Sequence, residues 1–411
     1  MPLLAEAELT QKTFAEHPFC RKWMMNHFPS NRLETIVLLL NSLRLVSHTE
    51  FERSLIGLII KTGNQLKGKI ALYCARELPS GMNYFPDDMG TAPSAVTPGN
   101  EVGSEGRLAH IARNIAREDP KKFLSHPSVS DLRKVKCHEI FILDDLIGSG
   151  ERIVEFAAAL NRDPHLKSWI SGRLVRITVI AYSVSRHGEQ AIRQGVKGLG
   201  EIKFECRPSA GSVWWSQEKR QEVLELCRTF GRRTKHPDAS LGYKDSFSLI
   251  VFEHGCPDNV PCILWSTGNW SALFKHRSIP IELSDCFDLK LSSRNTRLGL
   301  AFLGQTQLAG SSWIKGAGSD TQAIVLVLAA VSKKLRNLAR MSEYTGLSNT
   351  QCEQSIKRGI QYGLLTPGPY LTPLGLEELR RLKATEKSQR DVAEAGEPFY
   401  YPHALRGPGA I

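Results

Sequence analysis

A continuous apolar segment that ends in two adjacent acids constrains the fold of this chain more than any other feature. It reads EIFILDDLIGSGERI over residues 139–153. The apolar run at 137–143 is typical of a strand buried on both faces of a parallel sheet. A glycine-bearing loop follows, and residues 151–162 have the pattern of a helix. This order predicts a strand–loop–helix unit that binds a ligand at the carboxyl end of the strand.

Further apolar segments alternate with helical patterns on both sides of this unit. We predict strands at 69–79, 173–184, 203–208 and 247–255, and a helix at 103–119. Alternating strands and helices predict an α/β fold with a parallel sheet. We place this domain at residues 65–300, after an N-terminal helical extension at residues 1–64.

The glycine-bearing loop has the properties of a phosphate site. The backbone N–H groups of Gly148, Ser149 and Gly150 can converge on an anion at the positive end of the following helix. The hydroxyl of Ser149 and the guanidinium of Arg152 add further donors. The sequence therefore predicts that this loop binds a phosphate group.

The two acids beside the loop must contact a different part of the ligand, because carboxylates repel phosphate. Asp144 and Asp145 can accept hydrogen bonds from ribose hydroxyls or hold a hydrated Mg²⁺ ion. A ligand with a 5′-phosphate and a ribose diol would satisfy both the acids and the loop. The alternative is an ordinary turn with solvated acids, since short motifs often mislead.

These residues resemble a known family. The order of apolar strand, paired acids and hydroxyl-glycine loop is similar to the signature of type I phosphoribosyltransferases (PRTases). The resemblance implies that Asp144 and Asp145 contact the ribose hydroxyls of phosphoribosyl pyrophosphate (PRPP), that the loop holds its 5′-phosphate, and that Mg²⁺ accompanies the ligand. Arg152 departs from the family pattern, which has Thr or Ser at this position. Arginine also binds phosphate, but with a different geometry.

A second resemblance covers residues 241–277. This segment is similar to the closing segment of PRTase-like proteins from bacterial conflict and anti-phage systems. The matching residues are Gly242, Tyr243, Pro257, Asp258, Asn259, Trp265, Trp270, Leu273, Phe274 and Arg277. Aromatic residues at such positions are also typical of a protein core, so a structural role is the alternative.

Arg76 and Glu77 follow a predicted strand and should lie at the same sheet edge as the acids. This position predicts the pyrophosphate side of the site, and a surface ion pair between the two residues is an equal alternative. If the protein is an enzyme, pyrophosphate leaves the ribose C1′ through an oxocarbenium-like state. Arg76 and Mg²⁺ would then assist its departure, and the acids would stabilise the positive ring.

The composition changes after residue 300. A segment rich in Gly and Ser at 301–320 is predicted to be a linker. Residues 321–385 show helices separated by a Thr-Gly-Leu-Ser turn and followed by YLTPLG, and this order resembles a winged-helix domain. Residues 386–411 are predicted to form a flexible tail.

The segment at 348–358 is the predicted recognition helix. Its candidate contacts to nucleic acid are Asn349, Thr350, Gln351, Gln354, Lys357 and Arg358. Lys333, Lys334, Arg336 and Arg340 add basic charge nearby. The net charge of +11 also favours polyanionic partners. Winged helices serve as protein-interaction modules too, so that alternative stays open.

The cysteines and the apolar runs indicate the compartment. The nine cysteines are scattered, odd in number and without a CxxC pair, which favours a reducing environment. His254, Cys256 and Cys262 match no standard zinc spacing, so buried thiols are the simpler interpretation. The apolar runs are too short to span a bilayer, and the first residues lack a signal-peptide pattern. We therefore predict a cytoplasmic protein without a membrane partner.

Two functions compete for the whole chain. The first is an enzyme effector of a bacterial defence system, in which the winged helix tethers a PRTase-like domain to DNA or an RNA–DNA hybrid. The resemblance extends to retrons, which implies a reverse transcriptase as a partner, and an oligomer stays open. The second is a PRPP-sensing, DNA-binding regulator without catalysis, although such repressors usually carry the winged helix first. A scaffold with a decayed site is a third interpretation, and the intact acid pair and loop argue against it.

Overall fold

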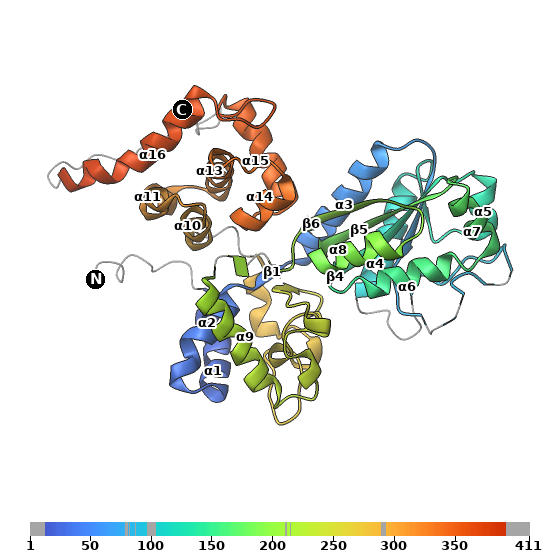
Figure 1. The fold of residues 1–411 in the computed structure, drawn as a ribbon, viewed down its shortest axis with the longest axis horizontal. Helices are drawn as coiled ribbons and strands as arrows, with labels where there is room; N and C mark the ends of the chain where they lie inside the picture. The colour runs from blue at the N-terminus through green and yellow to red at the C-terminus, as the bar shows by residue number, and fades with distance from the viewer. Residues whose placement is uncertain are drawn as a thin grey trace. The chain divides into compact units, whose positions relative to one another are not determined.

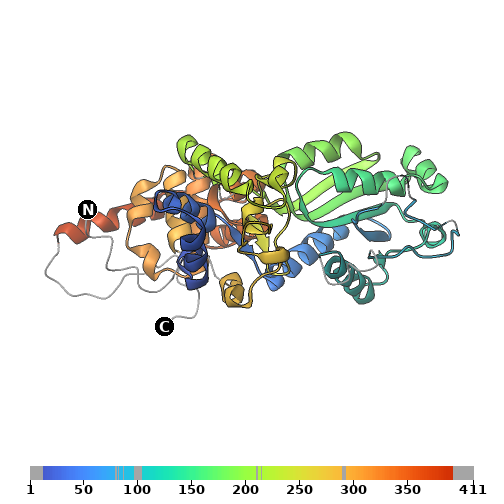
Figure 2. The same cartoon turned by 90° about the horizontal axis from the view of Figure 1, so that it is seen from below.

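Two compact units make up the protein in this computed structural model. The structure describes residues 13–78, 81, 83–86, 88–96, 104–209, 212–213, 215–288 and 293–391. The sheet unit contains Pro18–Ser209 and Gln221–Phe287, and the helical unit contains residues 13–17, 212–213, 215–220 and the described residues from Asp288 onward. Figures 1 and 2 show the ribbon from two directions, coloured from blue at the N-terminus to red at the C-terminus.

A five-stranded sheet forms the centre of the sheet unit. Its strand order is β3-β2-β4-β5-β6, and every neighbouring pair is parallel. The strands are β2 (Ile70–Cys74), β3 (Phe123–Ser125), β4 (Glu139–Ile147), β5 (Arg176–Val184) and β6 (Leu199–Cys206). The prediction of an α/β fold with a parallel sheet is confirmed.

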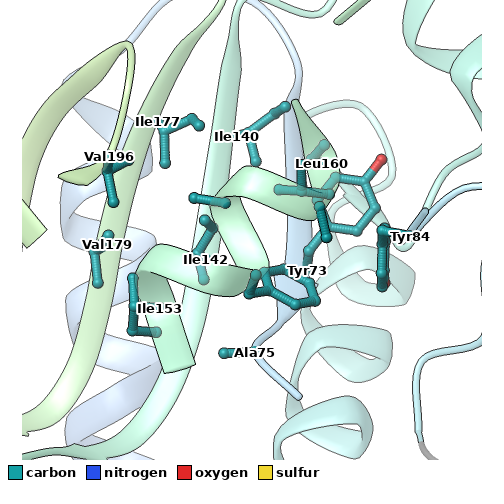
Figure 3. Packing of buried hydrophobic residues seen from close by; sticks show 14 of the residues in the cluster. Tyr73, Ala75, Tyr84, Ile140, Ile142, Ile153, Leu160, Ile177, Val179 and Val196 are labelled. Atoms are coloured by element: carbon teal, nitrogen blue, oxygen red, sulfur yellow. The ribbon is translucent and has the colours of Figure 1, made fainter. Parts of the chain in front are cut away.

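β4 is the middle strand, and all of its residues are buried. Successive side chains of a strand point to opposite faces of the sheet. Ile140 and Ile142 therefore pack into one hydrophobic cluster, and Phe141 and Leu143 into another. Figure 3 shows part of the first cluster, which unites side chains of the sheet with Ile153 from the helix after β4. The continuous apolar run of the sequence is therefore a strand that is buried on both faces of the sheet.

Helices cover both faces of this sheet. The apolar residues of α3 (His48–Asn64) and α4 (Ser104–Glu118) join the cluster around Phe141. The opposite face carries α5 (Val129–Lys134), α6 (Glu151–Leu160), α7 (Pro164–Ser171) and α8 (Arg186–Gly195). α4 follows β2 and α6 follows β4, so these two adjacent strands send their helices to opposite faces.

The described part of the predicted N-terminal extension belongs to the sheet unit from Pro18 onward. It contains α1 (Pro18–His27), α2 (Leu33–Asn41), β1 (Arg44–Val46) and α3. Its longest helix, α3, has an apolar side that is fully buried against the sheet, at Phe51, Leu55 and Ile59. This burial makes the extension part of the same packed unit.

The segment predicted as a strand at 247–255 lies outside the central sheet. β7 (Ile250–Phe252) pairs in parallel with β1 in a separate two-stranded sheet. The rest of the unit contains most of α9 (Gln217–Gly231) and short 3₁₀ turns. The turns are Ser30–Arg32, Pro237–Ala239, Tyr243–Asp245, Cys262–Leu264, Lys275–Arg277 and Ile281–Asp288.

The helical unit contains a helix-turn-helix followed by a wing. Its helices are α10 (Ser293–Phe302), α11 (Thr306–Gly310), α12 (Trp313–Gly316), α13 (Ser319–Ser332), α14 (Leu338–Thr345), α15 (Asn349–Gln361) and α16 (Pro373–Asp391). The turn between α14 and α15 begins at Gly346, whose φ of 74° favours glycine. Leu365 and Leu371 form an antiparallel bridge between α15 and α16, which is the predicted wing.

The range 301–320, predicted as a linker, is packed in the structure. Leu308 of α11 and Ile314 of α12 are fully buried in the core of the helical unit. The side-chain amide of Gln322 donates hydrogen bonds to the carbonyl oxygens of Ile314 and Ala317, at 3.0 and 2.8 Å. The Gly and Ser content suggested a linker, but the spaced apolar residues decide the fold because they enter a core.

The structure also shows where the cysteines lie and whether a described helix could cross a membrane. All nine cysteines are buried and free. Within the described ranges, no helix is both long enough and apolar enough to cross a membrane.

Candidate functional site

The acid pair lies at the point in the sheet where the helices that follow adjacent strands change from one face to the other. Asp144 and Asp145 are in the carboxyl-terminal half of β4, next to the end of β2. Open α/β sheets bind ligands at the carboxyl ends of adjacent strands whose helices lie on opposite faces. β2 and β4 are such a pair, so the fold places the acids at the position where these sheets bind ligands.

Four contacts hold the two carboxylates. Oδ1 of Asp144 accepts a hydrogen bond from the N–H of Asp145 at 3.0 Å, and Oδ1 of Asp145 accepts one from the N–H of Leu146 at 2.7 Å. Oδ2 of Asp144 lies 3.6 Å from Nε of Arg152. Oδ2 of Asp145 lies 3.6 Å from Nε2 of His254. The side chains of Asp144 and Asp145 are only 2% and 10% exposed, so water competes little for these contacts.

The surroundings shift the pKa values of the two acids in opposite directions. Burial opposes the ionisation of Asp145, but the His254 imidazole and the Arg152 guanidinium hold the pKa of this carboxyl well below its usual range. Burial raises the pKa of Asp144 well above its usual value; Arg152 opposes this rise and the charge of Asp145 adds to it. The surroundings therefore favour the charged form of Asp145 over the charged form of Asp144.

Gly148, Ser149 and Gly150 form a tight loop between β4 and α6. Gly150 has a φ of 82°, and a side chain there would meet the carbonyl oxygen of Gly188. A side chain at Gly148 would overlap the amide of Asn259. In the part of the chain that the structure describes, no group accepts a hydrogen bond from the N–H groups of the three loop residues. Unpaired N–H groups at the start of a helix are suited to an anion.

The segment at 242–247 packs beside this loop and pairs with Glu151, the acidic residue that directly follows the loop. The hydroxyl of Tyr243 and the ammonium of Lys244 both donate to the carboxylate of Glu151, at 3.1 and 2.5 Å. These hydrogen bonds lower the pKa of Glu151. The negative charge of Glu151 is thus paired, which reduces its repulsion of an anion in the loop.

Arg76 and Glu77 follow β2 at the same edge of the sheet. The N–H of Ala75 donates to the carbonyl oxygen of Leu143 at 2.8 Å, which keeps the chain beside β4 up to the acids. The Arg76 guanidinium lies 5.4 Å from the ring centroid of Tyr84, and its Nε is buried without an acceptor among the described residues. No ion pair joins Arg76 to Glu77 within those residues. The structure therefore brings Arg76 to the edge that carries the acids.

Most residues of the closing motif lie in the core of the sheet unit. Trp265 and Trp270 are nearly fully buried, and their indole N–H groups donate to backbone carbonyl oxygens at 2.8 and 2.7 Å. Nε of Arg277 donates to the carbonyl oxygen of Cys256 at 2.9 Å. Of the residues named for this motif, Asn259 is the one that packs against the glycine loop.

Sequence patterns did not identify His254 as a neighbour of the acids. Its ring stacks on Phe252 at 4.8 Å between centroids, and the centroid of Phe51 lies at 5.0 Å. Both ring nitrogens are buried and lack a hydrogen-bond partner among the described residues, apart from the 3.6 Å approach to Asp145. The signal in the sequence is the charged pair Glu253-His254 directly after a buried strand, the same pattern that revealed the acids.

Direct metal ligation does not suit the acid pair. Each of the four oxygens of Asp144 and Asp145 already faces a donor of the chain. Among the described residues, no group of three or more His, Cys, Asp or Glu side chains could hold a metal ion. The partial zinc pattern at 254–262 therefore does not form such a group. Among the described residues, Asp144 and Asp145 are therefore not part of a ready-made cluster of metal ligands.

The exposed side of α15 carries a row of polar side chains. Gln351, Gln354 and Lys357 are exposed and lie one helical turn apart. The Gln351 side chain also accepts a hydrogen bond from the N–H of Ser348 at 2.8 Å, which caps the helix. Asn349 and Thr350 lie at the start of the helix and are half-buried.

Arg358, also predicted to contact nucleic acid, is paired inside the helical unit. Its guanidinium lies 2.7 Å from the carboxylate of Asp320 on α13. The basic residues predicted nearby are exposed, at Lys333, Lys334, Arg336 and Arg340. The Arg336 guanidinium lies 4.0 Å from the ring centroid of Tyr370 in the wing, which links this basic group to the wing.

Two family models match the chain. The first, described as PRTase-CE, matches residues 20–276, which is more than half of the sequence. The chain belongs to the PRTase-CE family. The second model, described as wHTH-PRTase associated, matches residues 325–407. No curated protein and no solved structure matches the chain.

The PRTase-CE match follows the sheet unit closely. It begins within α1 and ends next to Arg277, so it includes the N-terminal helices, the acid pair, the loop and nearly all of the closing segment. The second match starts within α13 and includes α14, α15 and the wing. A PRTase-like domain followed by a winged-helix domain, predicted from sequence motifs, is thereby confirmed.

Proposed function

We propose that the PRTase-CE domain binds PRPP or a related ribose 5-phosphate ester at the carboxyl ends of β2 and β4. The observation that carries this proposal is the loop of Gly148, Ser149 and Gly150, whose N–H groups lack acceptors among the described residues and stand directly beside the acid pair. A 5′-phosphate in this loop would place the sugar over the acids. The paired charge of Glu151 leaves the loop free for an anion.

The acid pair is chemically matched to a ribose diol. Asp145, whose charged form is favoured, can accept a hydrogen bond from one hydroxyl, and Asp144, whose pKa is raised by burial, can bind the other. Hydrogen bonds to an ionised group are stronger than those between neutral groups. In this proposal Asp145 contributes most of the affinity for the sugar.

In the enzyme form of this proposal, the domain transfers the phosphoribosyl group. A nucleophile on the acceptor forms a bond to C1′, the C1′–O bond breaks, and pyrophosphate leaves with the electron pair. Arg76 at the end of β2 would neutralise the departing oxygens. The negative charge of Asp145 would stabilise the positive charge that builds on the ring. Mg²⁺, bound to the diphosphate, would add Lewis-acid assistance to its departure.

Calorimetric titration of the full-length protein with PRPP tests this function directly. We expect binding, and release of pyrophosphate once the correct acceptor is supplied. Binding without release, over a panel of acceptors, would instead favour a PRPP-sensing regulator. Absence of any binding would contradict the proposal as a whole.

We further propose that the winged-helix domain tethers the protein to nucleic acid, either DNA or an RNA–DNA hybrid. The support is the exposed row on α15 together with the exposed basic group that ends at the wing. The resemblance of the closing segment supports a role as an effector in bacterial defence. In a retron, the partner to test is a reverse transcriptase with its RNA–DNA product.

Replacing His254 should make ligand binding sensitive to mild acid. Wild-type binding that needs an ionised Asp145 is lost only as the pH falls through its depressed pKa. His254→Phe keeps the stacked ring but removes the nitrogens, so the pKa of Asp145 rises and the loss moves to a higher pH. Between pH 7.5 and pH 5.5, we expect the variant to lose about tenfold more PRPP affinity than the wild type.

The comparison with wild type cancels the titration of the ligand itself. His48→Phe is the matched control, because His48 lies 6.1 Å from the His254 ring and contacts Glu253, not the acids. Equal pH profiles for wild type and His254→Phe would show that His254 does not act on Asp145.

Lys357→Ala should weaken nucleic-acid binding through the loss of one phosphate contact. We expect the slope of log affinity against log salt to fall by about one. Fluorescence anisotropy with duplex DNA at several salt concentrations measures this slope. Lys315→Ala, an exposed lysine on α12, is the control with the same change in charge. Arg358→Ala should have the smaller effect, because Asp320 pairs with this arginine at 2.7 Å, whereas Lys357 is more exposed and lies 3.5 Å from Glu353; identical slopes for all variants would exclude α15 as the interface.

A further inference from the structure

We propose that Arg152 supplies the positive charge at the acid pair that a metal ion would otherwise supply, so that the ribose end of the site binds its ligand without a cation on Asp144 or Asp145. This inference rests on the proposed ribose-phosphate function. It assigns Arg152 to the acids, whereas the sequence pattern assigned it to the 5′-phosphate.

The first support is the direction of the Arg152 side chain. It begins in the first turn of α6, where its guanidinium could have extended toward the loop, yet its Nε lies 3.6 Å from Oδ2 of Asp144. The guanidinium is permanently charged and two-thirds buried at this position. An arginine that is held between the chain and a buried carboxylate acts as a counter-charge for that carboxylate.

The second support is that each carboxylate oxygen already faces a polar group of the chain. Backbone N–H groups occupy both Oδ1 atoms, and Arg152 and His254 approach the two Oδ2 atoms. A magnesium ion needs oxygen ligands in near-ideal octahedral geometry at about 2.1 Å. A metal ion bound to Oδ2 of Asp144 would lie close to the guanidinium, which repels it.

The third support is that the competing acid has its own partner. Glu151 lies next to Arg152 in sequence and would be the simplest counter-ion for it. Instead, the Glu151 carboxylate accepts from Lys244 and Tyr243, which belong to the closing segment. The charge of Arg152 is therefore left to the acid pair, and the largest cause of its raised pKa is Asp144.

Ribose 5-phosphate is the probe that distinguishes an effect of Mg²⁺ on the acid pair from the binding of Mg²⁺ by the ligand itself. It contains the phosphate and the diol but lacks the diphosphate that chelates Mg²⁺ in PRPP. Calorimetry on the full-length protein would compare ribose 5-phosphate and PRPP, each in excess Mg²⁺ and in EDTA. For the wild type, we expect the affinity for ribose 5-phosphate to change less than about threefold when Mg²⁺ is removed.

Two variants of Arg152 complete the test. Arg152→Thr introduces the residue type that the type I PRTase signature has at this position, and in EDTA it should lose about tenfold or more in affinity for ribose 5-phosphate and recover part of the loss with Mg²⁺. Arg152→Lys keeps the charge and should stay independent of Mg²⁺. Thermal unfolding of each variant confirms that the sheet unit is folded before binding is compared.

The outcomes separate the two proposals. Loss of wild-type ribose 5-phosphate binding in EDTA, or an Arg152→Thr variant that binds as well as wild type in EDTA, would overturn the role of Arg152 and leave the ribose-phosphate function intact. Failure of the wild type to bind either sugar phosphate under any condition would instead overturn the function itself.

Discussion

Asp145→Asn should lose about 100-fold in affinity for PRPP, whereas Asp144→Asn should lose less than about tenfold. The reason is the protonation of the pair. Asp145 carries the negative charge because His254 and Arg152 outweigh its burial, so an amide removes a charge-assisted hydrogen bond to the sugar. Burial raises the pKa of Asp144 and so disfavours its charge, and asparagine has nearly the same shape without a charge. Calorimetric titration of both variants with PRPP at neutral pH measures the difference.

The two variants control each other, because both replace one buried carboxyl in β4 with an amide of equal size. Asp144→Asn also leaves Arg152 without its nearest carboxylate, so its unfolding temperature is measured beside the affinity. Equal losses for the two variants would show that the acids share one role. A larger loss for Asp144→Asn would reverse the assignment of charge.

Trp270→Ala should reduce the free energy of unfolding of the sheet unit by about 3–5 kcal/mol. The indole is nearly fully buried and packs against aromatic rings from α1, from the residue that follows α1 and from α9. Those rings are Trp23, His27, Phe28 and Phe230. Its N–H donates to the carbonyl oxygen of Ile263 at 2.7 Å, and that group would be left without this partner. Urea unfolding followed by far-UV circular dichroism measures the loss.

The matched variant is Trp270→Phe, which keeps an aromatic ring and should cost less than the alanine variant. Because Trp270 supports the closing segment from the core, the folded fraction of either variant should bind PRPP with nearly wild-type affinity. A loss of affinity without a loss of stability would place this tryptophan in the ligand site after all.

Local patterns predicted the parts of the site that are contiguous in the chain. The apolar run of β4, the acids, the glycine loop and the start of α6 follow one another within 139–153, and each can be recognised from its neighbours. The helix-turn-helix was predictable for the same reason, since Gly346 and the capping residue Ser348 mark the turn directly.

Contacts between distant segments could not be predicted in this way. His254 reaches Asp145 because β7 pairs with β1 beside α3, and no local pattern indicates that pairing. The range 301–320 has the composition of a linker, yet Leu308 and Ile314 are buried, because burial depends on which surface is available to cover them.

Patterns in the sequence were enough to predict the types of the elements, the parallel sheet, the glycine loop and the family, because periodicity, turn residues and short motifs act over a few neighbouring positions. Packing between distant segments, in contrast, sets the surroundings of the two acids and the direction of the Arg152 side chain. A carboxyl's pKa depends on burial and on charges within a few ångströms, and packing brings these together from far along the chain. The fold therefore gives two adjacent aspartates different surroundings, which shift their pKa values in opposite directions.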